Sequence, residues 1–229
     1  MPQPSALTDD SRATSFNPTA VLFDLDGTIT DSGPAITSSI AETLNAFGYP
    51  ARSNEDLLAM VGPPIRDGFA DHIGVPEHQI DDVVADYRTR YNDRMLDAPL
   101  FPGIADVVRN LHARGIPLAV ATSKRQSLAA VIIQHAGLTP YFLTVRGASE
   151  DGSRSTKSQI IEDALADLRA ADADLRRTVM VGDRHYDVDG GKEHGLATVL
   201  VTWGYAAPGE ADHADVIVDS HEALAEVLA

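Results

Sequence analysis

Short runs of consecutive apolar residues recur along this chain, and polar segments with helical spacing separate the later runs. The runs span residues 20–24, 117–122, 177–182, 197–202 and 215–218. A strand that is covered on both faces shows a nearly continuous apolar run rather than strict alternation. We therefore expect an α/β fold, in which helices cover both faces of a doubly wound parallel sheet.

One gap between these runs, residues 25–116, is far longer than a single crossover helix requires. The gap shows helical rather than strand periodicity. Its first apolar stripe consists of Ile36, Ile40, Leu44 and Phe47, and Gly48 stands where it can end that helix.

The rest of the gap continues the helical pattern. Ser53 and Asp56 have the spacing of a capping box, and a further helical pattern extends over residues 77–96. We therefore expect a helical cap domain at residues 34–98, inserted into an α/β core formed by residues 19–33 and 99–229. Such an insert would lie over the carboxyl ends of the strands, where open α/β sheets bind ligands.

The amino-terminal segment is polar and contains spaced prolines. Residues 1–18 include no apolar stretch of the signal-peptide type, and we expect them to form a disordered tail. No later apolar stretch approaches the ~20 residues that a membrane span needs. We therefore expect a cytoplasmic protein.

The charge balance narrows the class of partner. The chain has 18 basic and 34 acidic residues, a formal net charge of −16, and no cysteine. Nucleic acids and anionic membranes require basic patches, so neither is an expected partner. The absence of cysteine excludes disulfides, thiolate metal sites and cysteine nucleophiles. A small anionic substrate still fits if a metal makes the site locally positive, and the protein is expected to be a monomer or a homodimer.

Polar side chains gather at the ends of three of the predicted strands. They are Asp24 and Asp26 after the first run, Thr122, Ser123 and Lys124 after the second, Lys157 before the third, and Asp183 and Asp187 after it. Because the carboxyl ends of parallel strands meet at one edge of a sheet, these side chains are expected to converge on one crevice.

The residue types in this crevice indicate phosphoryl transfer. Carboxylates without imidazole or thiolate partners suit a hard cation such as Mg²⁺, whose charge lets several of them stay ionised together. A lysine and a threonine add donors for phosphoryl oxygens, and a carboxylate can serve as a nucleophile. The histidines His72, His78, His112 and His194 show no metal-ligand spacing and are expected to face solvent.

Five segments resemble, in this order, motifs of the haloacid dehalogenase superfamily. They are DLDGTITDSGPAI, VGPPI, AVATSK, DGSRSTKSQII and MVGDRHYDVDGGKEHG. They are similar in particular to the phosphoglycolate phosphatase-like branch, whose helical cap is inserted after the first motif. The resemblance implies a Rossmann-like core and a Mg²⁺-dependent phosphatase that hydrolyses a small-molecule phosphate monoester, with a phosphoglycolate-like substrate favoured.

The resemblance also implies catalytic and metal-binding roles. Asp24 would be the nucleophile that forms an aspartyl-phosphate, and Asp26 would be the general acid and base. Thr122 would hold a phosphoryl oxygen, and Lys157 would neutralise the nucleophile and the transferring group. The Mg²⁺ ligands would be the Asp24 side chain, the Asp26 main-chain carbonyl, Asp183, and Asp187 directly or through water.

Substrate recognition is expected from the insert and from the second motif. The Ser123 backbone and Lys124 would line the phosphate pocket. Arg66 either binds a carboxylate or second phosphate through two parallel hydrogen bonds, or is a solvated arginine at a helix start. Arg184 could reach the same site, whereas His185 is more simply a surface residue.

Several alternatives remain open at the level of sequence. Asp26 favours a phosphatase over a dehalogenase, because an alkoxide leaving group needs a proton and a halide does not. A 5′-nucleotidase and a phosphomutase would share the same core motifs. A phosphoacceptor signalling domain also uses clustered aspartates around Mg²⁺, but it is shorter and has no large insert after its first strand.

Overall fold

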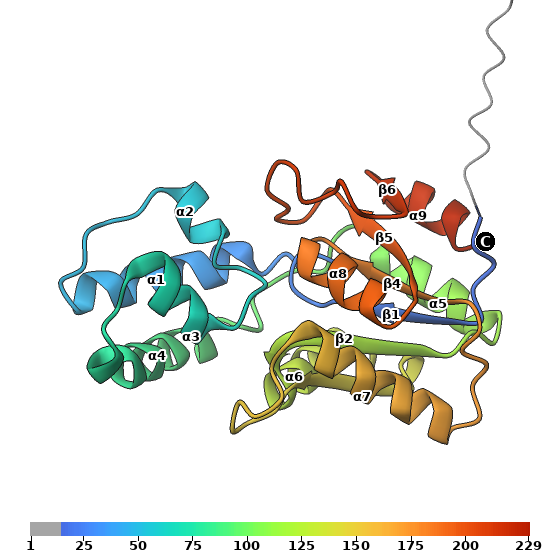
Figure 1. Cartoon of the computed structure of the whole chain (residues 1–229), viewed down its shortest axis with the longest axis horizontal. Coiled ribbons are helices and arrows are strands. Elements are labelled where there is room, and N and C mark those ends of the chain that lie inside the picture. Colours follow the sequence, from blue (N-terminus) through green and yellow to red (C-terminus); the bar gives the residue numbers. More distant parts are fainter. Residues whose placement is uncertain (1–14) are drawn as a thin grey trace, which may run out of the picture.

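The computed structural model describes residues 15–229, and the larger of its two parts is a six-stranded parallel sheet covered by helices (Figure 1). The strands are β1 (Ala20–Phe23), β2 (Leu118–Arg125), β3 (Thr144–Ala148), β4 (Thr178–Gly182), β5 (Ala197–Val201) and β6 (Val216–Val218). They lie in the order β3-β2-β1-β4-β5-β6. The chain thus winds outward from β1 in both directions, which confirms the expected doubly wound sheet.

One strand, β3, is missing from the apolar pattern of the sequence. Its residues are TVRGA, and the side chain of Arg146 reaches Asp167 on a neighbouring helix at 2.6 Å. β3 pairs only with β2 and forms an edge of the sheet, so half of its side chains stay partly exposed. An edge strand of this kind can contain an arginine and a glycine, which hide it from a search for continuous apolar runs.

Helices cover both faces of the sheet (Figure 1). Those of the core are α5 (Ile104–Ala113), α6 (Gln126–His135), the short 3₁₀ helix η2 (Thr139–Tyr141), α7 (Lys157–Ala170), α8 (His185–Glu193) and α9 (His221–Val227). Val21 and Phe23 of β1 pack with α5, α6 and α9, whereas Ala20 and Leu22 pack with α7. This alternation follows from the two-residue period of a strand, so β1 is buried on both sides.

The segment between β1 and β2 forms a separate helical part, on the left of Figure 1. Its helices are α1 (Gly33–Ala46), α2 (Asn54–Leu58), α3 (Ile65–Asp67), the π-helix η1 (Gly68–Ile73) and α4 (Glu77–Asn92). They enclose an apolar cluster of their own, in which Ile40 and Phe69 are fully buried. The expected helical insert is therefore present.

Two details of the insert differ from the sequence-based expectation. The α1 helix ends at Ala46, and Phe47 is 37% exposed rather than part of the buried stripe. Gly48 follows with a φ of 74°, a value that glycine adopts without strain. The α4 helix ends at Asn92 rather than continuing to residue 96. The predicted capping box of Ser53 and Asp56 is confirmed.

The two chain segments that connect the insert to the core lie side by side. The Asp31 N–H donates to the Pro99 carbonyl at 2.9 Å, and the Phe101 N–H donates to the Ile29 carbonyl at 3.0 Å. The α5 helix, which follows the second segment, packs on the sheet rather than in the insert. The boundaries at residues 34 and 98 stay a prediction, and the paired segments fit them.

Of the predicted tail, residues 1–14 lie outside the described residues. Residues 15–18 are described, and there the Phe16 N–H donates to the Val227 carbonyl at 2.9 Å. Phe16 also packs against the apolar core, so contact with the core begins before residue 19. Among the helices of residues 15–229, none combines the length and apolar character needed to cross a membrane.

Candidate active site

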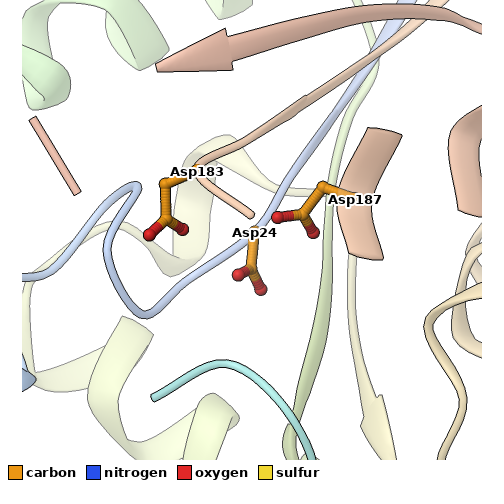
Figure 2. Close-up of side chains that lie close together, drawn as sticks. All are labelled: Asp24, Asp183 and Asp187. Carbon is orange, nitrogen blue, oxygen red and sulfur yellow. The ribbon is translucent and has the colours of Figure 1, made fainter. Parts of the chain in front are cut away.

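Three buried aspartates meet at the carboxyl ends of β1 and β4. Figure 2 shows Asp24, Asp183 and Asp187 with their carboxylates side by side, and one oxygen from each lies within 4.8 Å of the others. Their exposed fractions are 3%, 0% and 1%. The sheet order places β4 directly beside β1, so residues about 160 positions apart become neighbours at the point where the winding direction reverses.

Asp24 follows the last residue of β1. Its N–H donates to the Val181 carbonyl of β4 at 2.9 Å, which continues the parallel ladder by one bond beyond the strand. The backbone is therefore fixed at the position where the side chain turns into the site. Burial raises the pKa of Asp24 to about 6, with Lys157 opposing and Asp187 adding to this shift.

Asp183 lies in a cradle formed by two glycines. A Cβ added at Gly27 or at Gly204 would collide with the Asp183 side chain, and Gly27 has a φ of +83°. The carboxylate accepts the Tyr205 N–H at 2.7 Å and the Thr28 hydroxyl at 3.2 Å. Burial raises the pKa of Asp183 well above its ordinary value, and the Asp187 and Asp24 carboxylates add to the shift.

Lys157 supplies a cation that touches two of the aspartates. Its Nζ lies 2.9 Å from Asp24 Oδ1 and 2.6 Å from Asp187 Oδ1, and it donates to the Ala121 carbonyl at 3.0 Å. Burial lowers the pKa of Lys157, but Asp187 and Asp24 outweigh this effect and raise it overall. The lysine is therefore charged at neutral pH and balances one of the three carboxylates.

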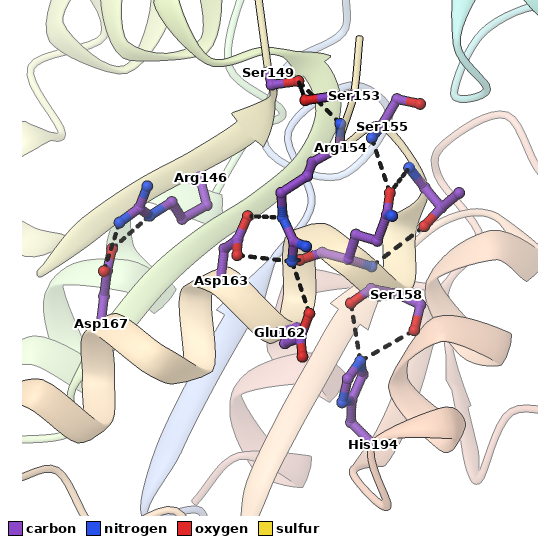
Figure 3. A network of polar contacts seen from close by, with 12 residues as sticks. Arg146, Ser149, Ser153, Arg154, Ser155, Ser158, Glu162, Asp163, Asp167 and His194 are labelled. Atoms are coloured by element: carbon purple, nitrogen blue, oxygen red, sulfur yellow. Dashed lines mark hydrogen bonds and ion pairs between the residues drawn. The ribbon is translucent and has the colours of Figure 1, made fainter.

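A network of polar contacts holds the start of α7, where Lys157 is the first residue (Figure 3). Thr156 and Gln159 form a capping box. Arg154 binds Asp163 at 2.9 Å and Glu162 at 2.7 Å. These contacts hold the first turn of the helix, so the Lys157 backbone is fixed before its side chain enters the site.

The same network corrects one expectation from the sequence. His194 does not simply face solvent, because its Nε2 lies 2.9 Å from the Ser158 carbonyl and 3.1 Å from the Ser158 hydroxyl. The contact joins the end of α8 to the start of α7. A lone histidine after an acidic helix shows no spacing from which this contact could be predicted.

The donor set fits a hard divalent cation. Asp24, Asp183 and Asp187 are buried together, and Lys157 is the cation that pairs with two of them among the described residues. One ammonium leaves the cluster with an excess of negative charge, which a divalent cation with oxygen ligands would offset. Asp24, Asp183 and Asp187 can therefore hold a metal ion.

Asp26 lies apart from this triad and has its own partners. The Ser32 hydroxyl donates to Asp26 Oδ1 at 2.6 Å, and Lys124 Nζ lies 2.7 Å from Asp26 Oδ2. Lys124 also donates to the Tyr91 hydroxyl at 2.8 Å. Tyr91 belongs to α4, so this chain of contacts crosses from the core to the insert.

A cavity of about 420 Å³ opens between the insert and the core. Its lining includes Asp26, Ser123 and Lys124 but not Asp24. Thr122 is buried within β2, three residues before the strand ends, and its hydroxyl oxygen accepts the Lys124 N–H at 3.3 Å. The expected convergence of the motif side chains is therefore largely observed, with Asp26 between the cavity and the triad.

Arg66 lines the cavity too, but its guanidinium is paired with carboxylates of α4. Arg66 Nη2 lies 2.7 Å from Glu77 Oε1, and Nη1 contacts Asp81. These partners are on the exposed surface of the insert and are 86% exposed. Two carboxylates thus already compensate the charge of Arg66, which weakens the expectation that it binds substrate.

Arg184 reaches the insert rather than the aspartate triad. Its Nη1 donates to the Val61 carbonyl, and its Nε lies 2.7 Å from Glu210 Oε2. His185 Nδ1 lies 3.1 Å from Glu210 Oε1, and the His185 side chain is 38% exposed. Arg184 thus adds a second contact between the core and the insert, beside that of Lys124 with Tyr91.

Comparison with known proteins identifies the family. Residues 21–201 match the family of haloacid dehalogenase-like hydrolases. The chain belongs to this family. The aspartate triad, Lys157 and the inserted helices are therefore parts of a hydrolase of the phosphatase type.

Individual relatives include a protein named as a kinase as well as phosphatases. The chain is 40% identical over 213 residues to the tyrosine-protein kinase PtkA of Mycobacterium tuberculosis, covering 93% of this chain and 72% of that protein. It is 31% identical over 214 residues to a phosphoglycolate phosphatase of Agrobacterium fabrum, covering 90% and 91%. A solved structure, described as a predicted phosphatase from Clostridium acetobutylicum, superimposes with a TM-score of 0.84 at 32% identity, covering 91% of this chain and 97% of that chain.

Four residues with contacts at this hydrolase site were not predicted from the sequence. They are Ser32, Tyr91, Tyr205 and Glu210. Ser32 lies within the first motif segment, DLDGTITDSGPAI, so its place beside the site could have been predicted. The other three act through contacts between segments far apart in the chain, which no local pattern encodes.

Proposed function

We propose that this haloacid dehalogenase-like hydrolase releases phosphate from a small phosphate monoester, with Mg²⁺ as cofactor and phosphoglycolate as the favoured substrate. The observation that carries the proposal is the buried triad of Asp24, Asp183 and Asp187, with Lys157 against two of its members. A cluster of this composition suits the charge of a transferring phosphoryl group.

In the first step, a carboxylate oxygen of Asp24 attacks phosphorus and forms an aspartyl-phosphate. The bond from phosphorus to the ester oxygen breaks, and Asp26 gives its proton to the departing alkoxide. Lys157 balances the charge on Asp24, and Thr122 donates to a phosphoryl oxygen. Mg²⁺, held by Asp24, Asp183, the Asp26 carbonyl and Asp187, would shield the phosphoryl oxygens from the attacking carboxylate.

In the second step, water hydrolyses the aspartyl-phosphate. Asp26 is now a carboxylate and takes a proton from the attacking water, so it returns to its starting state. The Ser32 hydroxyl at 2.6 Å and Lys124 at 2.7 Å restrict the orientation of Asp26. An oriented acid next to the cavity supports ester hydrolysis over dehalogenation, because a halide leaves without a proton.

The size and composition of the cavity support a small substrate. A volume of about 420 Å³ suits a metabolite rather than a macromolecule. The similarity to a phosphoglycolate phosphatase over 90% of this chain favours phosphoglycolate. A nucleoside 5′-monophosphate is the next candidate and would fill more of the same cavity.

A second candidate function follows from the relative named a tyrosine-protein kinase, which is 40% identical to this chain. In that case the phosphoryl group would pass from a nucleotide to a tyrosine hydroxyl rather than to water. Labelling with γ-phosphate-labelled ATP and a tyrosine-containing acceptor distinguishes the two: a kinase leaves label on tyrosine, whereas the proposed hydrolase leaves none and releases inorganic phosphate from a phosphate monoester.

The proposal is tested by phosphate release from a panel of phosphate monoesters with Mg²⁺, using wild type and Asp24→Asn. Steady release by wild type and none by the variant supports it. Stoichiometric labelling without turnover would instead indicate a phosphoacceptor domain. Formation of an isomer from a hexose phosphate, without free phosphate, would indicate a phosphomutase.

A further inference from the structure

Four basic side chains line the cavity between the insert and the core. They are Arg66, Arg88, Lys124 and Arg125. Arg66 and Arg88 belong to the insert, whereas Lys124 and Arg125 end β2 of the core. Four acidic residues line the cavity as well, Asp26, Asp67, Glu150 and Asp151, so the lining is balanced in charge, whereas the chain as a whole has a net charge of −16.

Three of these four cations have a carboxylate partner. Arg66 pairs with Glu77 and Asp81. Lys124 Nζ lies 2.7 Å from Asp26 Oδ2, and Arg125 Nη1 lies 3.2 Å from Glu150 Oε2. Their charges are therefore compensated before any ligand binds.

Arg88 is the exception. Within residues 15–229, its guanidinium forms no ion pair and no hydrogen bond, although the side chain is partly buried against the cavity. Burial lowers the pKa of Arg88, and the neighbouring charge of Arg125 lowers it further. The Glu150 carboxylate acts on the pKa of Arg88 in the opposite sense but forms no ion pair with it among the described residues. A charged guanidinium without a direct partner in residues 15–229 therefore lines the cavity.

Arg125 contributes a second free donor. Its Nε is buried and has no hydrogen-bond partner among the described residues, while Nη1 is engaged by Glu150. A buried N–H without an acceptor is costly, and an anionic oxygen in the cavity would satisfy it. Arg88 from the insert and Arg125 from the core therefore face one space and both lack an acceptor there.

We propose that Arg88 and Arg125 bind a second anionic group of the substrate, so that the enzyme selects phosphate monoesters whose leaving group carries a carboxylate or another phosphate. This inference rests on the proposed function and deepens it. It assigns the recognition of that group to Arg88 and Arg125 rather than to Arg66, which is already paired with carboxylates. Because Arg88 belongs to the insert and Arg125 to the core, one anion bound to both would join the two parts.

The test compares the binding of two phosphonates that cannot be hydrolysed. Phosphonoacetate carries a carboxylate beside its phosphonate, and methylphosphonate does not. Calorimetry with Mg²⁺ gives the ratio of their dissociation constants for wild type, Arg88→Gln and Arg125→Gln. Arg90→Gln is the matched control, because Arg90 is on the same helix but pairs with Asp86 at 2.6 Å on the outer side of the insert.

Wild type and Arg90→Gln are expected to bind phosphonoacetate about 10-fold or more tightly than methylphosphonate, as a charge-assisted hydrogen bond predicts. Arg88→Gln should remove most of this preference, and Arg125→Gln part of it. Equal affinities in wild type, or an unchanged preference in Arg88→Gln, would overturn the inference. Since binding needs no turnover, this result is independent of whether the protein releases phosphate.

Discussion

The ammonium of Lys124 lies 2.8 Å from the hydroxyl oxygen of Tyr91, so a side chain of the helical insert touches the lysine that pairs with Asp26. Lys124 also lies 4.5 Å from the centre of the Tyr91 ring. Both contacts exist only while the insert is closed over the sheet. The position of the insert is thereby linked to the environment of the proposed acid and base.

Tyr91→Phe should lower kcat/KM for p-nitrophenyl phosphate by about three- to ten-fold, the effect of losing one hydrogen bond of about 1 kcal/mol. The ring would still pack, because it is stacked on Tyr87 at 5.7 Å. Steady-state kinetics with Mg²⁺ measures the change.

Tyr49→Phe is the matched control for this variant. The Tyr49 hydroxyl donates to Gln79 at 3.0 Å within the insert and has no contact with Lys124. Tyr49→Phe should lower the free energy of unfolding by a similar amount without changing kcat/KM. An equal loss of kcat/KM in the two variants would contradict a link between the insert and Asp26.

Asp26→Asn should lower kcat by about 10²- to 10⁴-fold, the range expected for loss of general acid and base catalysis. With the amide oxygen facing Lys124 and the amide NH₂ donating to the Ser32 hydroxyl oxygen, both contacts can be kept, so substrate binding should change little. The measurement is the separate determination of kcat and KM. An unchanged kcat would contradict the assigned role of Asp26.

Tyr205→Phe should destabilise the protein by about 1–3 kcal/mol, because the buried Gly33 N–H loses its acceptor. The Tyr205 hydroxyl accepts that N–H at 2.6 Å and donates to Asp31 at 2.7 Å, at the junction of core and insert. Thermal unfolding measures the loss. Tyr186→Phe, whose hydroxyl has no hydrogen bond among residues 15–229, should leave the unfolding temperature unchanged, and an equal loss there would argue against the assignment.

Mg²⁺ should stabilise the folded protein against heat, because the unfolded chain does not bring Asp24, Asp183 and Asp187 together. At about 100 times its Kd, one bound ion adds about 2.7 kcal/mol, which corresponds to a rise in Tm of roughly 5 °C or more. Asp183→Asn should lose this response. A Tm that is the same in Mg²⁺ and in chelator would exclude the proposed metal site.

The sequence predicted five of the six strands because each of them is a continuous apolar run. Four of these strands are mostly buried, and the edge strand β6 keeps the pattern because it consists of Val216, Ile217 and Val218, although Ile217 is 51% exposed. β3 escaped detection because an edge strand exposes part of its surface and can contain Arg146. Phe47 fitted the stripe of α1 by spacing alone, but the helix ends one residue earlier and the ring turns outward. Periodicity predicts which residues are candidates for burial but not where a helix stops.

At the site, spacing predicted the side chains that follow strand ends, because parallel strands align their carboxyl ends. Asp24, Asp183 and Asp187 were found in this way. The partners of Arg66 depend on how α3 and α4 pack within the insert, and the contact between Lys124 and Tyr91 depends on how the insert packs against the core. That packing is set by side chains of both parts together, and no single segment encodes it.

The central claim is that a phosphoryl group passes through Asp24 on its way to water. Acid quenching of the enzyme during turnover with Mg²⁺, followed by hydride reduction and peptide mass spectrometry, tests it directly. We predict a reduced residue at Asp24 only when substrate and Mg²⁺ are both present. Phosphate release at the wild-type rate by Asp24→Asn, with no modified peptide in the wild type, would contradict the account.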